Sequence, residues 1–144
     1  MFARTKAPLW MGLGLVGGLL LGWFAAAQSQ KSQRPMLFEL RIYTTAPGRL
    51  PKLHQRFRNH TMKLFKKHGM TNVGYWVPLD KKDTLIYIVA HRDQQAAKRS
   101  WEAFRNDPQW QKVFRESRKD GPIVTKVQRH FMRPTDYSPL QRTP

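Results

Sequence analysis

The stretch that most constrains the fold is residues 50–69, which has the periodicity of one long amphipathic helix. Its apolar side chains recur at helical spacing and fall on one face: Leu50, Leu53, Phe57, Leu64 and Phe65. Its most polar side chains fall on the opposite face: Lys52, Gln55, Asn59, Lys63 and Lys66. The apolar arc is wide, so the helix is expected to cover a large surface, most simply a sheet.

Three polar residues lie inside this apolar arc, at His54, Thr61 and His68. A spacing of seven aligns them along the helix, with a drift of about 20° per step. A buried polar group needs a partner, which a cavity can supply as water or ligand. The line therefore predicts a helix that lines a pocket. The alternative is that a backbone carbonyl satisfies Thr61 and that His54 lies at the rim of the core.

The charge balance restricts the choice of partners. With 26 Lys and Arg against 9 Asp and Glu, the formal net charge is +17. This favours an anionic membrane or cell-surface polymer, although a basic surface that simply faces water is the alternative. No nucleic-acid-binding motif is completed, so nucleic acid is not expected as a partner. The absence of cysteine excludes disulfides, thiolate metal sites and a cysteine nucleophile.

Residues 1–27 have the pattern of a signal peptide or an N-terminal membrane anchor. A basic start is followed by an apolar run and by three alanines that end at Ala27, where a peptidase could cut. Uncleaved, residues 9–27 have about the minimum length of a membrane span. Residues 28–35 are predicted to be a linker. The domain is therefore expected outside the cytoplasm, periplasmic or secreted, or anchored by residues 9–27.

The remaining chain alternates between strand and helix patterns. Strands are expected at residues 37–45, 72–77, 84–91 and 123–132, and a second helix, broken in two at Asp107 and Pro108, at residues 93–120. The order β-α-β-β-α-β predicts an α+β, ferredoxin-like domain with a four-stranded antiparallel sheet. It would occupy residues 36–134, and residues 135–144 would form a C-terminal tail.

The first strand has two different faces. Phe38, Leu40 and Ile42 alternate with the more polar set Glu39, Arg41 and Tyr43. Because two helices can cover only one face of the sheet, we expect the polar set to lie on the other face and to contact a second copy of the chain. Alternatively, Glu39 and Arg41 could supply a carboxylate base and an oxyanion partner.

Five segments resemble the NIPSNAP family: FELRIYTTAPGRL, RFRNHTMKLFKKHGM, VGYW, SWEAFRNDPQWQ and PTDYSPL. The resemblance covers residues 37–140 and implies a dimeric α/β barrel, in which two ferredoxin-like sheets pack face to face. Eukaryotic members are associated with mitochondria, vesicle traffic and mitophagy signalling, and most bacterial members have no settled activity. The wider barrel group includes cofactor-free monooxygenases, haem-binding chlorite dismutases and dye-decolorising peroxidases.

The histidines do not predict a metal site. Their spacing matches no metal-binding motif, and His54 and His68 would lie about 21 Å apart along the helix. No cofactor is predicted, although a single histidine could be an axial haem ligand. Trp76 and Trp101 are the aromatic residues expected closest to a cavity, because both flank the predicted boundary between sheet and helices.

These observations favour an exported binding or interaction module. The predicted pocket lies between the sheet and the helix at residues 50–68, and its candidate residues are His54, Thr61, His68, Trp76 and Trp101. Its ligand would be small and hydrophobic. The alternatives are a cofactor-free monooxygenase or isomerase that uses the same cavity, and a haem-binding barrel.

Overall fold

The structure is a computed structural model that describes residues 37–140, which lie in one compact unit formed by residues 33–144. The predicted signal peptide or anchor at residues 1–27 and the linker at residues 28–35 lie outside the described residues. Among the helices at residues 37–140, none combines the length and the hydropathy that crossing a membrane requires.

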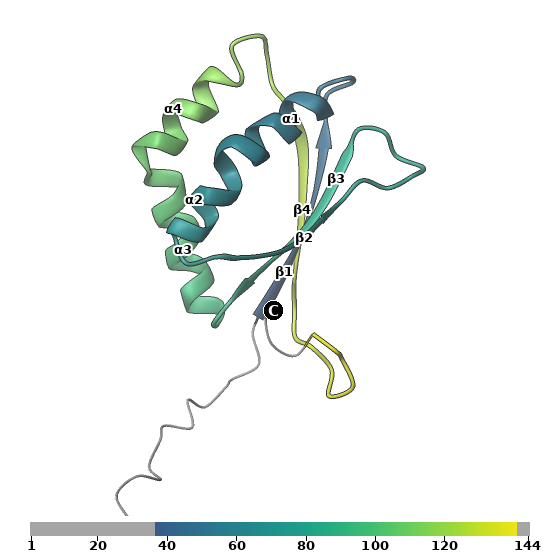
Figure 1. Ribbon diagram of the computed structural model, residues 1–144, viewed down its shortest axis with the longest axis vertical. Coiled ribbons are helices and arrows are strands. Elements are labelled where there is room, and N and C mark those ends of the chain that lie inside the picture. The colour runs from purple at the N-terminus through teal and green to yellow at the C-terminus, as the bar shows by residue number, and fades with distance from the viewer. Residues whose placement is uncertain (1–36, 141–144) are drawn as a thin grey trace, which may run out of the picture. The chain divides into compact units, whose positions relative to one another are not determined.

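Four strands and the helical segments between them follow the predicted order (Figure 1). The first half of the domain comprises β1 (Leu37–Thr45), α1 (Leu50–Arg56), a π-helical segment η1 (Phe57–Thr61), α2 (Met62–Lys67) and β2 (Thr71–Trp76). The second half comprises β3 (Thr84–His91), α3 (Gln94–Asn106), α4 (Pro108–Glu116) and β4 (Val124–Met132). The predicted α+β, ferredoxin-like fold is confirmed.

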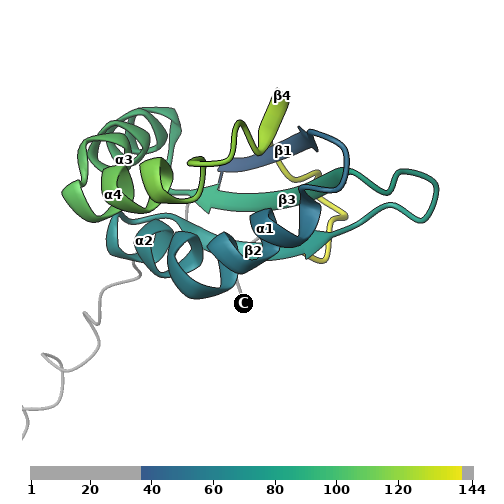
Figure 2. The ribbon, with the colours of Figure 1, turned by 90° about the horizontal axis from the view of Figure 1, so that it is seen from above.

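The sheet has the strand order β2-β3-β1-β4, with every neighbouring pair antiparallel. Figure 2 shows this order across the sheet, and Figure 1 shows the helices on one face of it. In the register, Arg41 of β1 lies between Tyr87 of β3 and Arg129 of β4. Strands β2 and β4 are the edges, and β4 exposes most of its residues.

The predicted helix at residues 50–69 is confirmed, but it is not a regular α-helix throughout. Between Phe57 and Thr61 it widens into a π-helical turn, and the Met62 N–H donates to the Phe57 carbonyl, five residues earlier. All five predicted apolar-face residues are buried. Single π-helical turns inside α-helices occur often at functional sites. The residues beside this turn are therefore candidates for a functional site.

Helices α3 and α4 each start at an aspartate. The Asp93 carboxylate accepts from the Ala96 N–H, and the Asp107 carboxylate accepts from the amides of Gln109 and Trp110. Such caps satisfy amide groups that have no partner within the helix. These contacts explain why the second helix breaks in two at the position that the sequence indicates.

The core fills the space between the sheet and the helices. Its centre is the Tyr87 ring of β3, which has rings from β1, η1 and β2 at centroid distances of 5.1–5.4 Å: those of Tyr43, Phe57 and Tyr75. Burial raises the pKa of the Tyr87 phenol well above its usual value, and this keeps the phenol neutral. Trp101 and Phe104 of α3 pack on the same cluster through Phe65.

The face assignment predicted for β1 was wrong. Glu39, Arg41 and Tyr43 point toward the helices: the Glu39 carboxylate contacts Trp101 of α3, and the Tyr43 ring contacts Phe57 of η1. The reason is that the Glu39 carboxylate, fully buried, finds donors inside the domain. The predicted dimer-face role of these three residues is therefore not compatible with their place in the fold.

The same register shows which residues lie on the opposite face of the sheet, here called the outer face. It carries apolar side chains of the two central strands, which are only partly buried: Leu40, Ile42, Ile86 and Ile88. At its β2 edge, Trp76 is 51% exposed and lies over Gly74, where an added Cβ would come within 2.4 Å of the indole ring. The outer face is therefore an apolar surface without a helical cover.

Candidate functional site

A cavity of about 240 Å³ lies between the helices and the β1–β4 side of the sheet. We call it the inner cavity. Its lining is mostly aromatic and aliphatic and comes from both layers: Tyr43, Arg56, Phe57, Thr61, Phe65, Phe104, Trp110, Phe114, Arg118, Val124 and Val127. Phe114 and Val127 are 36% and 47% exposed, so the cavity reaches the surface between α4 and β4.

Arg56 is the buried charge of this site. Its side chain, 5% exposed, leaves the last turn of α1, and its Cζ atom lies 5.3 and 5.7 Å from the centroids of two adjacent rings of α4, those of Trp110 and Phe114. The Nη1 atom donates to the Ser117 hydroxyl at 3.2 Å, whereas Nε has no hydrogen-bond partner in the described structure. Within residues 37–140, no carboxylate forms an ion pair with this guanidinium.

The surroundings of Arg56 alter its protonation equilibrium in both directions. Burial lowers the pKa of the guanidinium, the nearby Tyr43 and Tyr87 raise it, and Arg118 lowers it further. The net direction is downward, because desolvation disfavours the charged form. Since the pKa of arginine starts so high, the group still carries its charge at physiological pH. The site therefore holds a desolvated cation that has no counter-ion among residues 37–140.

Thr61 lines the same cavity but is not free. Its hydroxyl donates to the Arg56 carbonyl at 3.3 Å, a contact that spans the π-helical turn, and the side chain is 2% exposed. This geometry supports the alternative considered for Thr61, in which a backbone carbonyl satisfies the hydroxyl. Thr61 thus couples the shape of the π-helical turn to the wall of the cavity.

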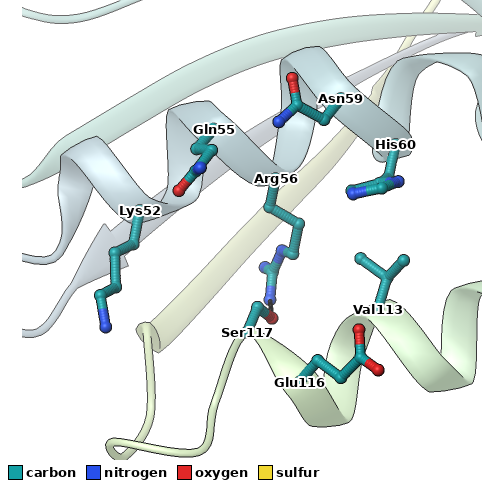
Figure 3. A pocket seen from close by; sticks show the side chains of 8 residues that line it. All are labelled: Lys52, Gln55, Arg56, Asn59, His60, Val113, Glu116 and Ser117. Carbon is teal, nitrogen blue, oxygen red and sulfur yellow. Dashed lines mark hydrogen bonds between the residues drawn. The ribbon is translucent and has the colours of Figure 1, made fainter.

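A polar groove of about 300 Å³ lies on the other side of Arg56, between α1–η1 and α4. Figure 3 shows its lining, with Arg56 reaching from the first helix toward Ser117, and Lys52, Gln55, Asn59 and His60 opposite Val113 and Glu116. The Lys52 ammonium is already paired with Asp120. Arg56 thus separates an apolar cavity from a polar groove.

A third cavity, of about 220 Å³, lies at the β2 edge, and we call it the edge cavity. It contains two of the predicted pocket residues, His54 and Trp76, together with Arg58 and Met62. Burial, and to a lesser extent Arg58, lower the pKa of the His54 imidazole. This imidazole is therefore favoured in its neutral form, which suits a partly buried position beside the helix.

The remaining predicted pocket residues have other partners. Trp101 donates from Nε1 to Glu39 at 2.6 Å and lines none of the three cavities. The His68 Nε2 atom lies 2.7 Å from the Asp107 carboxylate, which also accepts from Lys67 at 2.6 Å. The structure thus places these five residues in the inner cavity, in the edge cavity and in two polar contacts, of which the one between Trp101 and Glu39 is buried. It does not join them in one pocket.

The Glu39 carboxylate is the centre of a buried polar network. It accepts from Arg41 at 2.7 Å and from Trp101, and the His91 Nε2 atom lies 3.0 Å away. Burial raises the pKa of this carboxyl group, but the hydrogen bonds from His91, Trp101 and Arg41 outweigh that effect and lower it overall. An ionised carboxylate with all these donors is held in place, which fits a structural role better than that of a free base.

Sequence reasoning did not identify Arg56 or Arg118 as site residues. Arg56 lies outside the apolar arc of the first helix, and it is buried only because α4 packs against that flank. Long basic side chains beside an apolar stripe commonly reach solvent, so the helical position carried no distinguishing signal. The aromatic pair Trp110 and Phe114 at i, i+4 was the available hint, because such a pair can hold a guanidinium.

The domain is thus a ferredoxin-like α+β protein with an apolar cavity of ligand size between sheet and helices. The family model for NIPSNAP matches residues 38–139. The chain belongs to the NIPSNAP family. A search among curated proteins finds no significant match.

Several solved structures share the architecture of this domain. A NIPSNAP family protein of unknown function from Agrobacterium tumefaciens is 20% identical, with a TM-score of 0.66, and the match covers 74% of this chain and 95% of that chain. An uncharacterized NIPSNAP-like domain protein from Burkholderia xenovorans is 19% identical, with a TM-score of 0.67, and the match covers 76% of this chain and 94% of that chain. SnoaB, a cofactor-independent oxygenase from Streptomyces nogalater, is 15% identical, with a TM-score of 0.51, and the match covers 75% of this chain and 99% of that chain. At these identities the likeness concerns the fold.

Proposed function

We propose that this chain is a binding module that takes a small hydrophobic ligand in the inner cavity. The observation that carries the proposal is the lining of this cavity, which is largely aromatic and aliphatic and open at one end. An apolar cavity of about 150 Å³ holds benzene in a well-studied protein. The inner cavity, at about 240 Å³, has room for a larger molecule. Sites of this kind are typical of small-molecule binding.

The test uses residues 33–144, the compact unit, and 1-octanol as a neutral apolar probe. Saturable binding, followed by NMR shifts of the residues that line the cavity, is expected for the unchanged domain. Val127→Trp places a large ring at the open end and should weaken binding at least tenfold, whereas Lys112→Trp, at an exposed position of α4, should not. Absence of saturable binding, or equal binding by Val127→Trp, contradicts the proposal.

A cofactor-free oxygenase is the second candidate, because SnoaB shares the fold. The titratable groups that line the inner cavity are Tyr43, Arg56 and Arg118. Guanidinium groups stabilise a bound anion but do not abstract a proton at physiological pH. The lining therefore favours binding over catalysis by a general base. Oxygen uptake by the domain on addition of a ligand would favour the oxygenase instead.

We also propose a homodimer, now through the outer face. Leu40, Ile42, Ile86 and Ile88 lie there without a helical cover, and Trp76 is half exposed. A face of this kind is stabilised by contact with a second copy. Sedimentation of residues 33–144 at micromolar concentration should give a dimer, and Ile42→Lys should dissociate it while Ile42→Val does not. A folded monomer of the unchanged domain contradicts the proposal.

For location, we propose that the domain acts outside the cytoplasm, where its net charge of +17 favours anionic membranes or polymers. The succession of residues 1–27 supports this. N-terminal sequencing of protein from the native host should find Gln28 first if the segment is cleaved, or Met1 in a membrane fraction if it is an anchor. An intact Met1 in a cytosolic fraction would contradict export.

A further inference from the structure

Two guanidinium groups, those of Arg56 and Arg118, line the inner cavity and lie near the same ring, that of Phe114. Arg56 lies inside the cavity, and Arg118 lies at its exposed mouth with its Cζ atom 4.7 Å from the Phe114 ring centroid. The Phe114 ring thus has Arg56 and Arg118 within cation–π distance. In the described part of the chain, neither guanidinium forms an ion pair with a carboxylate.

Among the described residues, no negative charge accompanies these two guanidinium groups. Like charges at one site repel, and the guanidinium of Arg56 is buried with its Nε atom unpartnered. A buried charge is costly unless it is paired and hydrogen-bonded. Ring stacking and the single hydrogen bond to Ser117 offset only part of this cost. An anion between Arg56 and Arg118 would supply the missing counter-charge.

We infer that the ligand of the inner cavity is an amphiphilic acid. Its carboxylate would lie between Arg56 and Arg118, and its apolar body would pack on the rings of Phe57, Phe104 and Trp110. This inference rests on the proposed function and adds the chemical class of the ligand. A cavity of about 240 Å³ suits a medium-chain fatty acid or a single-ring aromatic acid.

The polar groove on the far side of Arg56 is the competing place for the anion. It is less suitable, because Glu116 lines it and would repel a carboxylate (Figure 3). Its Lys52 is occupied by the ion pair with Asp120. The described residues that line the inner cavity include no carboxylate, and they add Arg118. The charges therefore direct the head group to the cavity side of Arg56.

The test compares octanoate with 1-octanol, which share an apolar chain and differ in charge, on residues 33–144. Octanoate should bind about tenfold more tightly or better, as expected of a charge-assisted contact, and added salt should reduce this preference. Arg118→Gln should bring the octanoate affinity close to the octanol affinity measured with the same variant. Arg115→Gln, an exposed change on α4 outside the cavity lining, is the matched control.

The outcomes separate this inference from the proposed function. If octanol and octanoate bind equally, or if Arg118→Gln leaves the preference intact, the acid-binding inference fails while the binding module stands. If neither probe binds, both fail. Arg56→Met provides a second readout where it folds, and it should abolish the octanoate preference. Because Arg118 is exposed, Arg118→Gln should fold and decides the question alone.

Discussion

The Arg41 guanidinium lies over the indole ring of Trp101, with its Cζ atom 4.2 Å from the ring centroid. Both side chains also donate hydrogen bonds to the Glu39 carboxylate. Because Trp101 belongs to α3 and the other two residues to β1, these contacts attach the helix to the sheet. The attachment is polar and charged within a largely apolar layer, and it gives the domain a testable dependence on charge.

Replacing Glu39 with glutamine should destabilise the domain. The amide keeps the shape of the side chain but leaves Arg41 without the opposite charge, and breaking a buried ion pair costs about 3 kcal/mol or more. The free energy of unfolding from urea titration at neutral pH measures the effect. Glu102→Gln, on the exposed side of α3, is the control and should change little. A loss of under about 1 kcal/mol for Glu39→Gln would indicate that the network contributes little net stability.

The same carboxylate predicts the response to acid. Its pKa in the folded domain lies below the ordinary value of 4.5, because hydrogen bonds from His91, Trp101 and Arg41 outweigh the effect of burial. The stabilisation is therefore present above pH 4.5 and is lost as the pH falls through the folded pKa. Urea midpoints measured at successive pH values below 4.5 should decline more steeply for the unchanged domain than for Glu39→Gln. Parallel declines would contradict this assignment.

Trp101→Phe isolates the indole N–H. The substitution keeps an aromatic ring beneath Arg41 and removes the donor to Glu39. A hydrogen bond to a charged group contributes about 2 kcal/mol, so a loss of this order is expected in the unfolding free energy. Since Glu39→Gln alters the same contact, the double variant should lose less than the sum of the two single losses. Strict additivity would show that the two residues do not act together.

The two polar positions of the first helix should respond differently. Thr61→Val removes the hydrogen bond to the Arg56 carbonyl and should cost about 1 kcal/mol. His54→Leu should leave stability unchanged or raise it, because burial already disfavours the charged imidazole. Urea unfolding of both variants provides the comparison. If Thr61→Val is fully stable, its hydroxyl serves the cavity and not the helix.

The two helix-capping aspartates form a natural pair for comparison. Asp107 caps α4, binds Lys67 and His68 at the end of α2, and has a buried side chain. Asp93 caps α3, and its side chain is 43% exposed. Asp107→Ala should therefore lower the urea midpoint more than Asp93→Ala. Equal losses would mean that the capping bonds alone account for the effect and that the contacts with α2 add nothing.

The strand and helix pattern could be predicted because it depends on local periodicity. Strict alternation located β1, and the caps at Asp93 and Asp107 located the helix starts within one or two residues. The choice of buried face in β1 failed because both faces carry large side chains. Glu39 looked like an outward residue, yet its partners His91 and Trp101 lie 52 and 62 positions further along the chain.

The site was less predictable for the same reason. A polar residue inside an apolar stripe is visible in a sequence, and Thr61 was found in this way at the wall of the inner cavity. Arg56 was not found from the sequence, because its burial depends on contacts with Ser117 and Trp110, about 60 positions further along the chain. The residues around Arg56 give no sign that a second helix covers this flank of the first one.

The π-helical turn at residues 57–61 has a consequence for changes in chain length. A turn closed between Phe57 and Met62 contains one residue more than an α-helical turn. Deleting the exposed Asn59 would therefore restore a regular α-helix and keep the residues before and after the turn on their present faces. Elsewhere in the helix the same deletion would rotate the following residues by about 100° and expose Leu64 and Phe65. A one-residue deletion is therefore tolerated at this position. A homologue that is one residue shorter here would keep the fold and differ only in the wall of the inner cavity.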